Sequence, residues 1–136
     1  MDDKPELDAE TAEGEPHDPS AADGDVLREI SRSMIQIFKF QFGRGPEGIS
    51  TRYAGSDAIV SIVRNSLTPV ERSIRDMGEH QRLRDIRMLF QHATEPKFRS
   101  IVEEITGRRV VTFTSGIDIF EDVCTEFFEL EPPKRR

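Results

Sequence analysis

Tryptophan, tyrosine, cysteine and histidine are scarce in this chain. The 136 residues include no tryptophan, one tyrosine, one cysteine and three histidines. A single cysteine excludes an internal disulfide, and His80 and His92 have no cysteine or carboxylate cluster beside them that would complete a metal site. No apolar run approaches the ~20 residues needed to cross a bilayer. The sequence therefore predicts a soluble, cytoplasmic protein without metal, cofactor or membrane-inserted segment.

Catalytic patterns are missing as well. Cys124 falls in a predicted strand, where a small buried side chain is its expected role, and no cysteine–histidine arrangement supports a nucleophile. Glu103 and Glu104 are adjacent on a predicted helix, so their carboxylates diverge and do not form an acid–base pair. We find no catalytic residues and expect a protein that is not an enzyme.

Charge is distributed unevenly along the chain. Residues 1–24 contain nine acidic residues and one basic residue, whereas the remainder contains 17 acidic and 18 basic residues. A segment with high charge and few apolar residues cannot offset its ordering entropy. We therefore expect a disordered acidic tail at 1–24, a single domain at 25–131 and a mobile basic end at 132–136. The tail is either a solubilising extension or an arm that binds a basic partner.

The first predicted element is an amphipathic helix over residues 25–42, because its apolar residues recur at intervals of three and four. Its apolar surface is wider than one stripe, and such surfaces are usually covered. We predict a homodimer that uses this helix. The alternative is that the long middle helix covers the second face within one chain. The candidate interface residues are Ile35, Phe38, Phe40 and Phe42.

Two pairs of strands follow from alternating or β-branched segments. Residues 49–53 and 58–63 are joined by a short turn and predict an antiparallel hairpin. Residues 110–114 and 123–130 predict a second hairpin, with 115–122 as its connection. On the last strand, Cys124, Glu126 and Phe128 share one face.

The middle of the chain is predicted to be helical. Thr68, Pro69 and Glu71 form a capping box, in which Thr68 and Glu71 satisfy each other's backbone amide groups. Pro96 should break or kink the helix near residues 94–95, and Gly107 is placed to end it in a left-handed conformation. The resulting order, α-β-β-α-α-β-β, predicts an α+β fold with one four-stranded antiparallel sheet built from two hairpins and with helices packed on it.

Several short motifs occur in an order that resembles the MpsC-like family of small bacterial proteins. They are Gly43-Arg44-Gly45-Pro46, Leu67-Thr68-Pro69 with Glu71, Ile86-Arg87, and Ile105-Thr106-Gly107 before Val110-Val111. The family usually has an aspartate after the third strand, where this chain has Gly116, with Asp118 two residues later. The family's name refers to a membrane-potential-generating system linked to cation and inorganic-carbon transport. The resemblance implies an accessory or regulatory protein that contacts a partner, such as a membrane transport complex, at the cytoplasmic side.

Two binding functions are weighed against this expectation. A small-anion or nucleotide site could use Gly43, Arg44, Gly45 and Pro46 together with Arg52 and Tyr53, because glycine-flanked amides and arginine bind phosphate or carboxylate. The simpler interpretation of the same glycines is a helix C-cap turn. Nucleic-acid binding is not expected. The arginines of residues 72–87 alternate with acidic residues, as on a solvated helix face.

Overall fold

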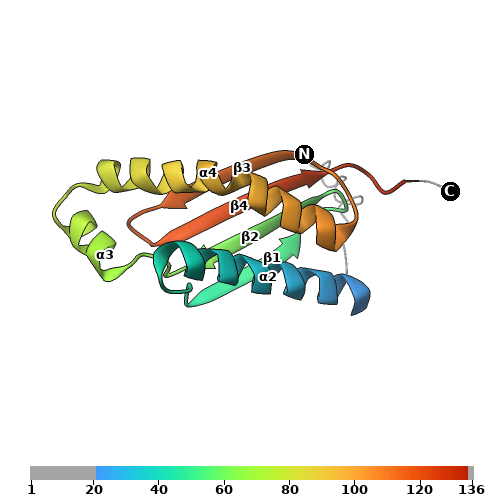
Figure 1. The fold of residues 1–136 in the computed structure, drawn as a ribbon, viewed down its shortest axis with the longest axis horizontal. Helices are drawn as coiled ribbons and strands as arrows, with labels where there is room; N and C mark the ends of the chain where they lie inside the picture. Colours follow the sequence, from blue (N-terminus) through green and yellow to red (C-terminus); the bar gives the residue numbers. More distant parts are fainter. Residues whose placement is uncertain (1–20, 135–136) are drawn as a thin grey trace, which may run out of the picture.

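The computed structural model describes residues 21–134 and contains one four-stranded antiparallel sheet with three helices (Figure 1). The α+β class and the predicted order of elements are confirmed. The elements are α2 (Ala21–Phe42), β1 (Gly48–Tyr53), β2 (Ala58–Arg64), α3 (Pro69–Asp76), α4 (His80–Thr106), β3 (Val110–Asp118) and β4 (Val123–Leu130).

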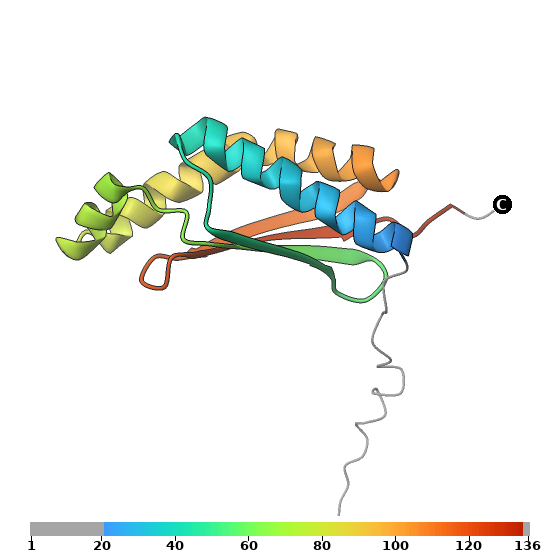
Figure 2. The same ribbon diagram turned by 90° about the horizontal axis from the view of Figure 1, so that it is seen from below.

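Helices α2 and α4 lie on one face of the sheet, and the short helix α3 lies beyond the end of the sheet beside the start of α4 (Figure 2). The strand order is β1-β2-β4-β3, so the two hairpins meet through the central strands β2 and β4. Side chains alternate between the faces of a sheet. The inward face of β4 carries buried Cys124, Glu126 and Phe128, while Thr125 and Glu129 on the outward face are exposed. Among the described residues no helix covers that outward face.

The core lies between the helix layer and the inward face of the sheet. Four aromatic rings connect α2, α4, β3 and β4, with centroid separations of 6.4, 5.6 and 5.1 Å along the series Phe38, Phe98, Phe113 and Phe128. These separations suit tilted aromatic pairs. The helix layer is therefore fixed on the sheet by contacts that join the first and last thirds of the chain.

Two boundaries differ from the sequence prediction by more than one residue. Helix α2 begins at Ala21, so residues 21–24, which we assigned to the acidic tail, are helical; the predicted disorder of residues 1–20 concerns residues outside the described range. Strand β3 continues to Asp118, because residues 115–118 pair with β4. Gly116 is part of this ladder, and the turn is made by residues 119–122 with Asp122 at φ 58°.

Pro96 does not end the middle helix, which was predicted to break or kink there. Helix α4 runs from His80 to Thr106 with Pro96 inside it. Proline removes the hydrogen bond to the carbonyl group four residues earlier. Here that carbonyl belongs to His92, an exposed residue. The opposite side of the helix is held by buried Phe98 and Val102.

Candidate functional site

One end of the domain is organised around the buried side chain of Arg87. The predicted capping box is present at the start of α3, with Thr68 accepting from the Glu71 amide and Glu71 accepting from the Thr68 amide. Arg87 is fully buried and donates to Glu71 Oε1 and Oε2 at 2.8 and 2.9 Å and to the Ser66 carbonyl at 2.8 Å. Its guanidinium carbon lies 3.8 Å from the ring centroid of Phe42, a cation–π contact.

Glu71 is ionised in this setting. Burial is the largest single influence and opposes its ionisation, but the hydrogen bonds from Arg87 and Thr68 together outweigh burial and lower the pKa of Glu71. The charged pair is therefore satisfied on both sides. Removing either partner would leave a desolvated charge.

The short connection between β2 and α3 is held by three further side chains. Asp122 Oδ1 accepts from the Ser66 amide at 2.9 Å and from the Leu67 amide at 3.2 Å. Arg44 donates to the Leu67 carbonyl at 2.7 Å, and Arg72 donates to the same oxygen at 2.8 Å. The motif residues around positions 44, 67–71 and 87 thus converge on one connection and give it a structural role.

The candidate anion site is not assembled. Arg44 uses its guanidinium group for the carbonyls of Asn65 and Leu67 and lies 3.6 Å from the Glu47 carboxylate. Arg52 is exposed at the far end of β1, opposite Val60. Strand geometry puts residues 48 and 52 about 13 Å apart. Gly43 has the positive φ, 78°, that suits the end of a helix, and Gly45 and Pro46 lie in the same turn.

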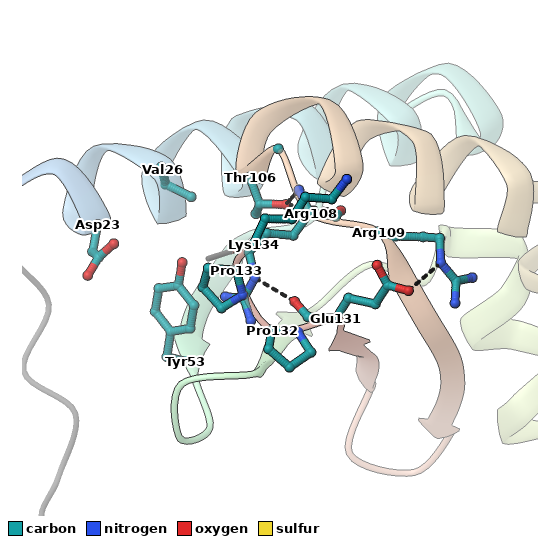
Figure 3. Close-up of a pocket in the computed structure, with 11 residues that line it drawn as sticks. Asp23, Val26, Tyr53, Thr106, Arg108, Arg109, Glu131, Pro132, Pro133 and Lys134 are labelled. Atoms are coloured by element: carbon teal, nitrogen blue, oxygen red, sulfur yellow. Dashed lines mark hydrogen bonds and ion pairs between the residues drawn. The ribbon is translucent and has the colours of Figure 1, made fainter. Parts of the chain in front are cut away.

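Tyr53 lines a cavity at the opposite end of the domain (Figure 3). This cavity has a volume of about 730 Å³ and lies where α2 begins and where α4 and β4 end. Burial, assisted by the charge of Asp23, raises the pKa of Tyr53, and Arg108 opposes the rise. Arg108 donates to the Glu131 and Ser56 carbonyls at 2.8 and 3.0 Å and pairs with Asp57. Its guanidinium is therefore committed to holding chain segments together. The α4 C-cap, Gly107 at φ 72°, is at the same end.

A polar layer crosses the inward face of the sheet. The register aligns Thr51, Ser61, Glu126 and Ser115 across β1, β2, β4 and β3. Ser31 of α2 contacts Thr51 at 2.7 Å, and Thr51 contacts Ser61 at 2.9 Å. Gln91 of α4 donates to Ser115 at 2.7 Å and also to Glu126. Burial raises the pKa of Glu126 to about 7, although bonds from Ser115 and Gln91 and the charge of Arg87 oppose the rise.

The four interface candidates on α2 have different surroundings. Phe38 is only 1% exposed and belongs to the core, so a partner cannot reach it. It lies on the inward side of α2, as its position in the apolar stripe of that helix predicts. Ile35 is half-buried, and Phe42 packs edge-to-face on Phe90 with centroids 5.6 Å apart. Phe40 is 84% exposed. Of these four residues, Phe40 alone presents most of its side chain to solvent.

Besides Phe40 on α2, three large apolar residues of α4 are exposed. Ile86, Leu89 and Phe90 are spaced so that they share one helical face, and they are 43%, 67% and 41% exposed. Phe40 is on the neighbouring helix α2, and its ring lies 5.5 Å from the Lys97 ammonium group, seven residues after Phe90 on α4. We call these four residues, Phe40, Ile86, Leu89 and Phe90, the outer helical surface.

Sequence reasoning missed several of these roles. Arg87 was treated as one of many solvated arginines, although it stands next to Ile86 in a family motif. Asp122 was assigned to a loop without a partner. The inward position of Glu126 followed from the alternation on β4, but its contact with Gln91 depends on where α4 crosses the sheet. That crossing has no local sequence signal.

The described residues also limit what the site can contain. Within residues 21–134 no group of three or more histidine, cysteine, aspartate or glutamate side chains is placed to hold a metal ion. No helix in the same range is both long and apolar enough to cross a membrane. Burial raises the pKa of Cys124 to about 12, so its thiol stays protonated and is a poor nucleophile.

Comparison with known proteins gives one match. Residues 22–131 match the family model described as Na+-translocating membrane potential-generating system (MpsC). No curated protein and no solved structure matches the chain. The matched range includes Arg87 and the residues that it contacts, the polar layer and the outer helical surface.

Proposed function

Because the chain belongs to the MpsC family, we propose that it is a non-catalytic accessory protein that binds a protein component of a Na+-translocating, membrane-potential-generating system. The observation that carries this proposal is the outer helical surface. Four large apolar side chains are exposed there on two adjoining helices. Contiguous exposed apolar residues are typical of protein interaction sites.

The charges around this surface indicate the chemistry of the partner. Lys39 and Lys97 are exposed near Phe40, and neither forms an ion pair within residues 21–134. A partner that buries the apolar residues gains if it presents carboxylates to these lysines. We therefore propose that the partner surface is apolar at its centre and acidic at the end that meets Phe40.

Site-specific photocrosslinking tests this proposal in native membranes. A benzophenone amino acid replaces Leu89 in one variant and Thr125 in a matched control. Both positions are exposed, but Thr125 lies on the outward face of the sheet. We expect position 89 to crosslink to a component of the Na+-translocating system and position 125 to give no such product. Crosslinking to that component from position 125 and not from 89 would move the docking site to the sheet and contradict the proposal.

The predicted homodimer would use part of the same surface. A two-fold contact through Phe40 would bring the Lys39 and Lys97 side chains of two copies together, and like charges in an interface oppose association. Sedimentation equilibrium of the wild type and of Phe40→Glu distinguishes the two uses of the surface. If the wild type is a dimer and Phe40→Glu is a monomer, a second copy of the chain occupies this surface. If the wild type is a monomer at micromolar concentration, the surface is available to a different protein.

A further inference from the structure

Glu126 and Gln91 are buried side chains that contact each other between the sheet and α4. Glu126 is 0% exposed and Gln91 is 1% exposed. Gln91 Nε2 donates to Glu126 Oε2. No ion pair among the described residues includes Glu126, and a buried carboxylate without a paired cation carries a large desolvation cost.

Two oxygen atoms of this pair have no hydrogen-bond partner among the described residues. They are Glu126 Oε1 and Gln91 Oε1, one on each side chain. A carboxylate is only an acceptor, so it cannot bond to the amide oxygen, but a neutral carboxyl group has one O–H donor. A proton on Glu126 Oε1 would supply the donor that both oxygens lack. The pair would then be joined by two parallel hydrogen bonds, N–H to carboxyl oxygen and O–H to amide oxygen.

We propose that Glu126 is a proton-binding site that works through Gln91: the neutral carboxyl group fastens α4 to the centre of the sheet, and loss of its proton breaks that attachment. The residues around the pair also support this proposal. Ser115 and Ser61 flank Glu126 in the register, and both are uncharged hydroxyl residues. The layer around the carboxyl group is thus polar but contains no counter-ion in contact with it.

A cavity adjoins the two residues that flank the Glu126 carboxyl group, Gln91 and Ser115. This cavity of about 90 Å³ beside α4 is also lined by His92 and Glu95, and these two residues reach the surface. The other charged or titratable groups whose fields act on Glu126 are Arg87 on α4 and Cys124 on β4. From α2, Ser31 joins the polar layer and adds no charge.

The direction of the pH effect follows from the raised pKa of Glu126. Its usual value is 4.5 and its value in the folded domain is about 7. Between these values the folded chain binds more protons than the unfolded chain, so stability falls as pH rises and levels off above about pH 7. For one proton, the unfolding equilibrium constant rises by up to about tenfold per pH unit in this window.

Urea unfolding of the wild type, Glu126→Gln and Glu129→Gln between pH 4.5 and 8.5 tests the proposal. Glutamine at 126 can keep two bonds to Gln91 as an amide pair but has no proton to lose. Glu129 is on the outward face of the same strand and is exposed, so its variant is the charge-matched control. From pH 5 to pH 7 we expect the unfolding constants of the wild type and of Glu129→Gln to rise by on the order of a hundredfold relative to that of Glu126→Gln.

A direct titration completes the test. With carbon-13 in the glutamate carboxyl groups, we expect the Glu126 resonance to titrate near pH 7 and to be missing in Glu126→Gln. Parallel unfolding profiles for wild type and Glu126→Gln, or titration of Glu126 below pH 5, would overturn the proposal. All measurements use choline chloride and are repeated in sodium chloride at equal concentration. A sodium-dependent stabilisation that Glu126→Gln abolishes would assign the site to a metal ion and would also overturn it.

Discussion

In the segment 86–91 of α4, the two faces of the helix differ in the opposite sense from those of an ordinary amphipathic helix. The inward face contributes Arg87 and Gln91 to the interior, both almost fully buried, whereas the outward face exposes Leu89 and Phe90. A surface helix normally directs apolar residues inward and polar residues to solvent. The buried polar side chains fix the position of α4 through directional bonds. The exposed apolar side chains are the basis of the partner contact that we propose.

The largest expected effect comes from breaking the inward face at Arg87. Arg87→Met leaves the Glu71 carboxylate, itself mostly buried, without its paired cation. We expect the free energy of unfolding to fall by about 3 kcal/mol, as for the loss of one partner of a buried pair. Arg82→Met removes an arginine from the same helix that is 78% exposed in its pair with Glu79, and it should cost about 0.5 kcal/mol or less. Urea unfolding measures both.

A second variant separates the ion pair from simple packing. If the loss reflects the stranded charge, Arg87→Met combined with Glu71→Gln should be more stable than the sum of the two single changes predicts. Strict additivity of the two losses would show that Arg87 acts by filling space and not by compensating Glu71.

The same pair predicts acid sensitivity. Because the folded pKa of Glu71 is lowered, its contribution to stability is present above about pH 4.5 and is lost as pH falls through the folded value. We expect Glu71→Gln to be about 2 kcal/mol less stable than wild type at pH 7. This difference should shrink as the pH falls from 4.5 toward 3. Glu79→Gln is the exposed control, and a constant difference for Glu71→Gln at every pH would contradict the assignment.

A smaller loss is expected at the start of α3. Thr68→Ala removes the side-chain oxygen that accepts from the Glu71 amide at 3.2 Å. N-cap replacements of this kind cost about 1 kcal/mol. Thr68→Ser keeps the hydroxyl group and should stay close to wild type in urea unfolding. An unchanged midpoint for Thr68→Ala would mean that the cap contributes nothing to the stability of the domain.

The smallest effect on stability is expected on the outward face. Leu89 is 67% exposed, and glutamate is a good helix former. Leu89→Glu should therefore change the free energy of unfolding by about 0.5 kcal/mol or less. A loss as large as that of Arg87→Met would show that Leu89 packs within the chain. In that case the exposed face of α4 would contribute to stability as the buried face does.

Much of the fold could be predicted because its signals are local. The stripe of α2, the alternation of β4 and the capping box at Thr68 each depend on residues within one or two turns of each other. The length of β3 could not be predicted from its own residues, because Gly116 resembles a turn residue and is held in the strand by pairing with Thr125. The continuity of α4 through Pro96 likewise depends on its packing against the sheet.

The candidate sites were harder to predict than the fold. Arg44 was weighed as an anion ligand, but its bonds to the Asn65 and Leu67 carbonyls come from a segment more than 20 residues away. Arg87 and Gln91 are polar residues whose burial depends on the sheet beneath them. Of the predicted interface residues, Phe40 is exposed and Phe38 is buried. The width of an apolar stripe does not reveal which of its edges is covered within the chain.

The central claim is that the outward face of α4 is a docking surface whose loss leaves the folded domain intact. Its most direct test is the Na+-dependent membrane potential of cells in which the endogenous copy is replaced by Leu89→Glu, with Thr125→Glu as the exposed control on the sheet. We expect Leu89→Glu to accumulate to the wild-type level yet to support only a small part of the wild-type potential change, because a charge placed in an apolar interface weakens partner binding. Thr125→Glu should match the wild type. A normal potential with Leu89→Glu would contradict the account.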